Sequence, residues 1–137
     1  TGFNLVALKW ISHYLKTAEF EAAILRGLGF FKDHFFREDG APKYFHNATF
    51  PIDIHSVAQS IITLCTFGDH AARNVDLAHG VLLWAKANMW NNRGYFYFQQ
   101  HRHYTIRTPF MRWSQAWMLL ALATLLYKSS QKKDWTQ

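Results

Sequence analysis

The chain has 137 residues, of which 50% are hydrophobic and 18% are aromatic, a composition that supports one packed domain and excludes intrinsic disorder. Its single cysteine, Cys65, excludes an internal disulfide framework and a cysteine-based zinc site. The formal net charge of +6 favours an acidic partner, such as an anionic sugar, a phosphate, a nucleic acid or a membrane surface.

Apolar periodicity predicts five helices along the chain. They cover residues 3–15, 18–35, 54–67, 76–89 and 109–127. Thr17 is expected to cap the second helix, because a short polar side chain accepts a hydrogen bond from the first free amides, and the third helix is expected to begin after Asp53. Gly68 marks the end of the third helix. The fifth helix is expected to begin at Pro109, with Thr108 as its cap.

These helices are of two kinds. The first, third and fifth are apolar on most sides, whereas the second and fourth carry charges on one face. A helix that is apolar all round has to be buried all round. The alternation therefore predicts an inner layer of helices enclosed by an outer layer.

An internal repeat joins the segments that precede the third and fifth helices. Each segment has a glycine turn, an aromatic pair, a polar loop, a proline and then an apolar helix. Gly40 and Gly94 are 54 residues apart, and Pro51 and Pro109 are 58 apart. In the second copy, residues 94–107 alternate like a short β-hairpin placed between helices. The pattern predicts two copies of one helical-hairpin unit.

The segments RWSQAWMLLALATLL and DIHSVAQ, together with this alternation, resemble the carboxyl-terminal part of six-hairpin α/α-toroid proteins. That superfamily includes glycosidases, polysaccharide lyases and sugar epimerases, and the likeness is to bacterial members associated with polysaccharide genes. Some of those are named δ-aminolevulinic acid dehydratases, but that chemistry uses a β/α barrel and a Schiff-base lysine, and this chain has no alternating β/α pattern.

The resemblance implies an all-α fold: a partial toroid of five helices over residues 1–128, one short β-hairpin near 94–107, and a C-terminal tail over 129–137. It also implies a substrate site in the central cavity, at the end formed by the loops that enter the inner helices. An inner-ring edge left open by a partial toroid is expected to be covered by a homodimer.

A first candidate cluster lies in and after the loop that enters the third helix. Asp53, His55 and Tyr44 are expected to be catalytic, because a His beside a carboxylate acts as a general acid or base near neutral pH and a Tyr takes the same role in lyases and epimerases. His46 and Gln59 are expected to bind substrate, and Gln59 shares a helix face with His55. The alternative is structural: Asp53 caps the helix, His55 is a satisfied core residue and Gln59 bonds a loop carbonyl.

A second candidate cluster lies between Arg93 and Trp117, where four arginines and two histidines interleave with aromatic residues and no acid occurs. Aromatic faces stack on sugar rings, and guanidinium groups bind carboxylate or sulfate oxygens in pairs. This predicts a subsite for an anionic saccharide, with Arg112 added to the catalytic set. The expected substrate-binding residues here are Tyr95, Tyr97, Gln99, His103, Arg107, Trp113 and Gln115. Because an unpaired buried charge is unfavourable, the alternative for Arg112 is a structural bridge to an acidic residue of a neighbouring hairpin.

The scarcity of acids bears on the reaction. A glycosidase normally needs two carboxylates, and Asp53 is the one well-placed carboxylate, so proton transfer of the lyase or epimerase kind is favoured over hydrolysis. Enzymatic activity itself is left open, and a non-catalytic helical-repeat interaction module is the alternative. No metal and no cofactor are expected. Nucleic-acid binding is not favoured, because the basic residues do not line one helix. Membrane insertion is not expected, and the lack of a recognisable signal peptide favours the cytoplasm.

Overall fold

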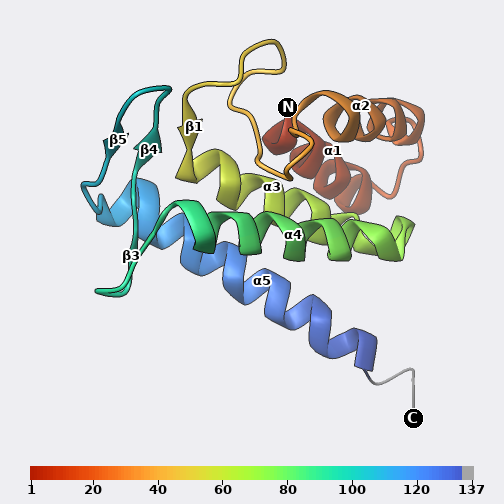
Figure 1. The fold of residues 1–137 in the computed structure, drawn as a ribbon. Helices are drawn as coiled ribbons and strands as arrows, with labels where there is room; N and C mark the ends of the chain where they lie inside the picture. The colour runs from red at the N-terminus through yellow and green to blue at the C-terminus, as the bar shows by residue number, and fades with distance from the viewer. Residues whose placement is uncertain (134–137) are drawn as a thin grey trace.

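The computed structural model describes residues 1–133, and helices dominate it. The helices are α1 (Gly2–Leu15), α2 (Glu21–His34), α3 (Ile54–Thr66), α4 (Ala72–Asn88) and α5 (Ala116–Lys133), with a 3₁₀ turn η1 (Gly68–His70) and a π-helical turn η2 (Met111–Gln115). The strands are β1 (Ile52–Asp53), β2 (Trp90–Asn91), β3 (Tyr95–Phe96), β4 (Gln99–Gln100) and β5 (Thr105–Ile106). The fold is therefore helix-dominated, as expected, but it carries a small antiparallel sheet and is not purely α (Figure 1).

Helix α3 lies at the centre of the molecule, between α1 and α5. At its start, the ring of His55 contacts Phe3 of α1 and Trp117 of α5, with centroid distances of 5.4 and 4.5 Å. At its other end, the Lys9 ammonium of α1 donates to the Thr66 carbonyl. The three helices therefore run in the same direction, while α2 and α4 run back (Figure 1).

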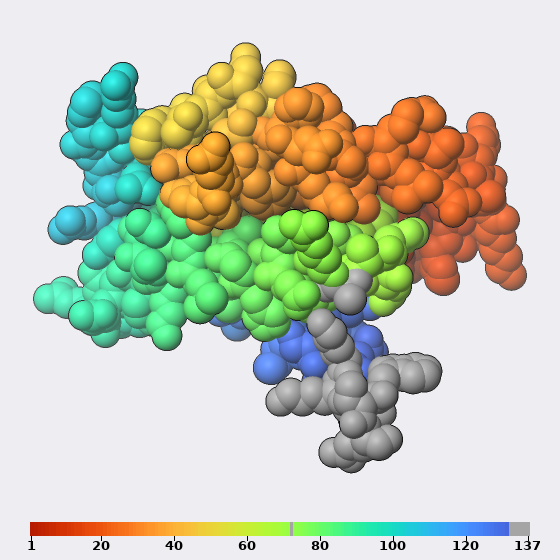
Figure 2. All heavy atoms as spheres, turned by 45° about the vertical axis from the view of Figure 1, so that its right-hand side comes forward, coloured from red at the N-terminus to blue at the C-terminus, as the bar shows by residue number. Residues whose placement is uncertain are grey.

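The hydrophobic core forms two clusters. The larger one joins α3, α4 and α5, and α3 supplies Ile54, Val57 and Ile61, all fully buried. The smaller one joins α1 and α2 around Leu5 and Leu28. The loop after α2 closes over α4, where the Trp84 indole donates to the Asp39 carboxylate over 3.2 Å. In Figure 2 this segment and α4 lie in contact across one face of the molecule.

Only α3 is enclosed among the three helices expected to be buried all round. On α1, Trp10 is 52% exposed and Tyr14 is 76% exposed. On α5, Leu119 is 69% exposed and Leu126 is 73% exposed. The expectation of complete burial is therefore wrong for α1 and α5. Each packs against α3 on one side, and no described element covers the opposite side.

The internal repeat is visible in the backbone. Gly40 and Gly94 both adopt a positive φ, +83° and +93°, and each amide donates to the carbonyl three residues before it. The pairs that flank the two turns are Phe36 with Pro42 and Trp90 with Phe96. Corresponding positions are 54 residues apart throughout, so one β-turn unit precedes both α3 and the η2–α5 segment.

The expected hairpin near residues 94–107 is divided between two small sheets. Strand β3 pairs back with β2, whereas β4 and β5 form the hairpin itself. Strand β1 joins that hairpin through the Asp53–Gln99 and Ile52–Gln100 pairs. The hairpin is thereby fixed to the residue that begins α3.

The expected boundary at residue 128 does not coincide with a change of structure, because α5 continues to Lys133. Residues 134–137 of the expected tail lie outside the described part of the chain. Over residues 1–133, no helix combines the length and apolarity that crossing a membrane requires.

Candidate functional site

A cavity of about 390 Å³ opens at the N-terminal ends of α1 and α3, beside η2, and we call it the amino-end cavity. It collects residues from four separate segments of the chain. The lining residues are Thr1, Gly2, Phe3, Phe31, Phe35, Lys43, Tyr44, His55, Ser56, Gln59, Ser60 and Trp113. Four of the residues singled out from the sequence, Tyr44, His55, Gln59 and Trp113, are therefore brought together here.

His55 stands in the first turn of α3 within an aromatic enclosure. Its ring lies 5.4 Å from the ring of Phe3, 5.6 Å from Trp113 and 4.5 Å from Trp117. Its Nε2 atom is buried and has no hydrogen-bond partner among residues 1–133. Burial lowers the pKa of this imidazole, and the nearby Asp53 carboxylate only partly opposes the shift. The His55 imidazole is therefore neutral at pH 7, which is the form that can accept a proton.

Asp53 is buried and serves as the N-cap of α3. Its Oδ1 accepts from the backbone amide of His55 over 2.8 Å, and its Oδ2 accepts from Gln99 Nε2 over 2.9 Å. It is not part of the cavity lining. Both carboxylate oxygens are used for structure, which agrees with the structural alternative for Asp53.

Gln59 lines the cavity one turn beyond His55. Its Nε2 donates to Thr63 Oγ1 over 3.1 Å, and that hydroxyl donates to the Gln59 carbonyl over 2.8 Å. The side chain is buried and held by a helix neighbour, so the loop carbonyl of the structural alternative is not its partner.

Lys43 is a lining residue of the cavity that the sequence did not single out. Its ammonium donates to the His46 carbonyl over 2.7 Å and lines the cavity beside Tyr44, whose ring is 47% exposed. The His46 ring instead packs on Phe30, with the centroids 5.7 Å apart, and lies outside the lining. The repeat could have identified Lys43: its amide donates to the carbonyl eight residues before it, as the amide of Tyr97 does in the second copy.

In the second cluster, the two glutamines are occupied within the fold. Gln115 of η2 donates to the Phe96 carbonyl over 2.8 Å and accepts from the Phe96 amide over 3.0 Å. Gln99 binds Asp53 and lies 2.9 Å from His101 Nε2. The expected substrate-binding roles of Gln99 and Gln115 would require these bonds to break.

The aromatic and basic residues of the second cluster form a surface beside the hairpin. The Arg107 guanidinium lies 5.4 Å from the ring centroid of Tyr97, and the Tyr97 hydroxyl accepts from Asn91. Tyr95 contacts Tyr97 edge-on at 6.2 Å. His103 is exposed at the hairpin turn. None of these four predicted residues lines the amino-end cavity.

Arg112 is exposed, contrary to the buried arginine that the alternative of a structural bridge assumes. It lines a second hollow of about 560 Å³ together with Trp113, Ala116 and Trp117. Trp113 is 59% exposed and lines both hollows, so it joins them. Asp53 and Arg112 lie at the same end of the inner helices but do not share a cavity.

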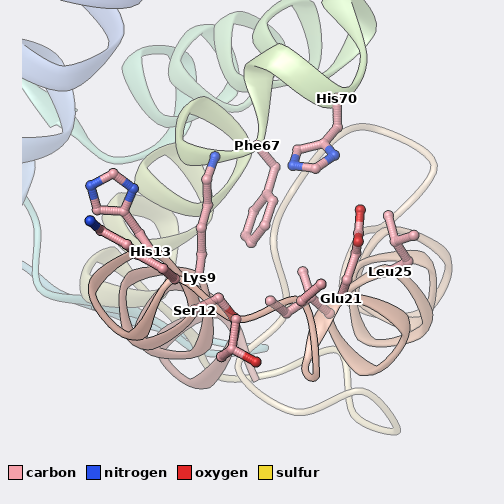
Figure 3. A pocket seen from close by; sticks show the side chains of 11 residues that line it. Lys9, Ser12, His13, Glu21, Leu25, Phe67 and His70 are labelled. Atoms are coloured by element: carbon pink, nitrogen blue, oxygen red, sulfur yellow. The ribbon is translucent and has the colours of Figure 1, made fainter.

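A third hollow, of about 470 Å³, lies at the opposite end of α1 and contains none of the predicted site residues (Figure 3). Lys9 and His13 enter it from α1, Glu21 from α2, and Phe67 and His70 from the end of α3. The Lys9 ammonium lies 5.0 Å from the Phe67 ring centroid, and burial lowers its pKa. Glu21 gives the wall of this hollow a carboxylate, whereas the amino-end cavity has none among its described lining residues.

Across residues 1–133, no group of three or more potential metal-ligating side chains comes together. Cys65 is buried within α3, and burial raises the pKa of its thiol to about 11. No family model, no curated protein and no solved structure matches this chain.

Proposed function

We propose that the amino-end cavity binds an acidic saccharide and that the chain is a carbohydrate-active protein of the α/α-toroid kind. The observation that carries the proposal is one hollow that holds a lysine, a neutral histidine and three exposed aromatic rings, those of Phe3, Tyr44 and Trp113. No carboxylate is among its lining residues within the described part of the chain.

The electrostatics of the cavity favour an anion. Lys43 contributes a full positive charge at the wall, and the N-terminal end of α1 contributes the partial positive charge of its free amides. The end of α3 contributes less, because the Asp53 carboxylate caps it. An acid lining the hollow would oppose a uronate or sulfate, and none does so among residues 1–133.

The aromatic rings supply the recognition of a sugar ring. Trp113 and Tyr44 are 59% and 47% exposed, and both border the cavity. Large exposed rings bind flat apolar faces at a low entropic cost because they have few rotatable bonds. Arg112, in the adjoining hollow, could bind a carboxylate of a neighbouring sugar unit with its planar fork.

For the reaction, proton transfer by His55 or Tyr44 is better supported than hydrolysis. A neutral His is a competent base, and the buried Nε2 atom of His55 would become reachable when Trp113 moves. Asp53 is assigned a positioning role, since it holds the helix turn that carries His55. Hydrolysis by paired carboxylates would need acids that the described cavity lining does not supply.

The toroid part of the proposal is supported by the alternation of helix directions and by the repeated turn unit. Helices α1, α3 and α5 are parallel neighbours, and the cavity opens where the loops enter them. A non-catalytic helical-repeat module remains the second candidate, favoured by the exposed apolar side chains of α1 and α5.

Calorimetric titration with a hexuronic acid oligomer tests the proposal, with a neutral hexose oligomer of the same length as the matched ligand. The acidic oligomer should bind and the neutral one should bind at least tenfold more weakly. Trp113→Ala should weaken binding about tenfold, a loss of about 1.4 kcal/mol. The control Trp10→Ala, an exposed Trp at the other end of α1, should change nothing.

A second pair of variants tests the charge. Lys43→Gln should weaken binding of the acidic oligomer, whereas Lys86→Gln, on an exposed face of α4, should not. Equal binding of the acidic and neutral oligomers, or no binding of either, would reject the proposal and leave the interaction module.

A further inference from the structure

Helix α5 carries a second apolar face, opposite the one that packs on α3. Its buried face includes Met118, Ala121 and Leu125. The exposed apolar residues recur every three or four positions, so together they form a face that runs along the helix. We call it the outer stripe, and it consists of Ala116, Leu119, Leu120, Ala123, Leu126 and Tyr127.

The outer stripe repeats every seven residues. Alanines recur at 116 and 123, leucines at 119 and 126, and large side chains at 120 and 127. A seven-residue apolar repeat is the pattern of a seam between two helices, in which large side chains enter hollows on the facing helix. Because the stripe holds both small and large residues, it is complementary to a second copy of itself.

Charge favours the same occupant. No charged residue occurs between Trp113 and Tyr127, whereas the chain carries a net charge of +6. Two copies of this positively charged chain would repel each other through most of their surfaces. The outer stripe is uncharged, so two copies can approach closely here without removing a charge from water. An acidic or nucleic-acid partner would find no cation here to bind.

The neighbouring helix α4 also exposes a large apolar side chain. His79 Nε2 of α4 lies 3.0 Å from Ser129 Oγ of α5, and Leu83, one turn further along α4, is 66% exposed. Figure 1 shows α5 along one edge of the molecule, with α3 and α4 on one side and no element on the other. Contiguous exposed apolar area of this kind marks an interaction surface.

We propose that the outer stripe is the interface of a homodimer, in which α5 packs antiparallel against α5 of a second copy. A twofold axis beside Ala123 sets Leu120 against Leu126, and Leu119 against Tyr127, of the second copy. The antiparallel arrangement also sets the positive end of each helix against the negative end of the other. No stripe residue lines the amino-end cavity, and of the stripe only Ala116 borders the adjoining hollow of Arg112, so the dimer is tested separately from saccharide binding.

Sedimentation equilibrium on the 137-residue chain, over a range of concentrations, tests this interface. The wild type should show twice the mass of one chain, and Leu119→Glu and Leu126→Glu should each give monomers. Leu25→Glu, at an exposed leucine of α2, should stay dimeric. Unchanged circular dichroism would show that the monomeric variants are folded.

Cross-linking tests the proposed axis. Under mild oxidation, Ala123→Cys should form a disulfide-linked dimer, whereas Ala87→Cys, exposed on α4, should not. The native Cys65 is fully buried and does not compete. A monomeric wild type, growth beyond the dimer, a dimer that survives both glutamate substitutions, or equal cross-linking of the two cysteine variants would overturn the proposal.

Discussion

The side chain of Gln99 donates to Asp53 Oδ2 over 2.9 Å and joins two residues that are 46 positions apart. The other oxygen of the same carboxylate accepts from the His55 amide at the start of α3. One buried carboxylate thus fixes both the β4–β5 hairpin and the helix turn that carries His55. These two hydrogen bonds explain why a carboxylate is buried at position 53, whatever ligand the nearby cavity binds.

Asp53→Ala should lower the free energy of unfolding by about 1–3 kcal/mol, because the helix loses its cap and Gln99 loses its acceptor. Asp53→Asn should lower it by less than about 1 kcal/mol, since Asn is an equally good cap. Urea denaturation measures both. Equal losses in the two variants would show that the negative charge, and not the cap, stabilises this corner.

Gln115→Ala should lower the free energy of unfolding by about 1–3 kcal/mol, since it removes two hydrogen bonds to the backbone of Phe96. Gln100→Ala is the control, because that side chain makes no hydrogen bond to any described residue. Thermal denaturation of both variants is sufficient. An unchanged midpoint for Gln115→Ala would mean that water replaces these bonds without loss.

Acidification should destabilise the protein through His55. Burial lowers the pKa of this residue in the folded state below its ordinary value of 6.5, so below pH 6.5 the unfolded chain takes up a proton that the folded chain does not. The stabilising contribution of neutral His55 is complete above pH 6.5 and declines as the pH falls toward the folded pKa.

Denaturant titrations across the pH range 5–8 measure this effect. His55→Phe keeps an aromatic ring beside Trp117 and should flatten the acid side of the profile. His103→Phe, at the exposed hairpin turn, should leave the wild-type profile unchanged. A His55→Phe profile parallel to that of the wild type would exclude His55 as the source.

Cys65 should be inert toward thiol reagents in the native protein. Burial raises the pKa of its thiol to about 11, so the reactive thiolate is rare at neutral pH, and the side chain is fully buried. Labelling by a disulfide reagent should be slow in buffer and rapid in denaturant. Rapid labelling of the folded chain would show that α3 opens readily.

The sequence predicted the ends of α3 well because the residues that start and stop this helix act locally. Asp53 caps the helix through its side chain, and the helix ends at Thr66, just before Gly68. Helix α2 begins at Glu21 and not at residue 18, because the Thr17 hydroxyl accepts from Glu19 and caps a turn instead. Helix α4 begins at Ala72, four residues earlier than expected, since its N-cap is Ala71 and makes no side-chain bond.

The amino-end cavity was only partly predictable. Tyr44, His55, Gln59 and Trp113 were recognised by residue type, but Phe3 enters the site through tertiary packing that no local pattern encodes. Lys43 is marked only by its place in the repeat, 54 residues before Tyr97. The alternative that Arg112 is a buried structural bridge was wrong for a related reason. Apolar content shows that a helix needs a partner, but it does not show that the partner lies in the same chain.

The π-helical turn at Met111–Gln115 affects the direction in which the side chains of Arg112 and Trp113 face. Its Gln115 amide reaches back five residues to Phe110 instead of four, which inserts one extra residue into the turn. Deleting a single residue there would restore ordinary winding, leave Phe110 bonded to the same amide, and change which side chains the turn presents. Residue count, as much as residue identity, thus aims Arg112 and Trp113, and a one-codon deletion could redirect them while the body of α5 stays in place.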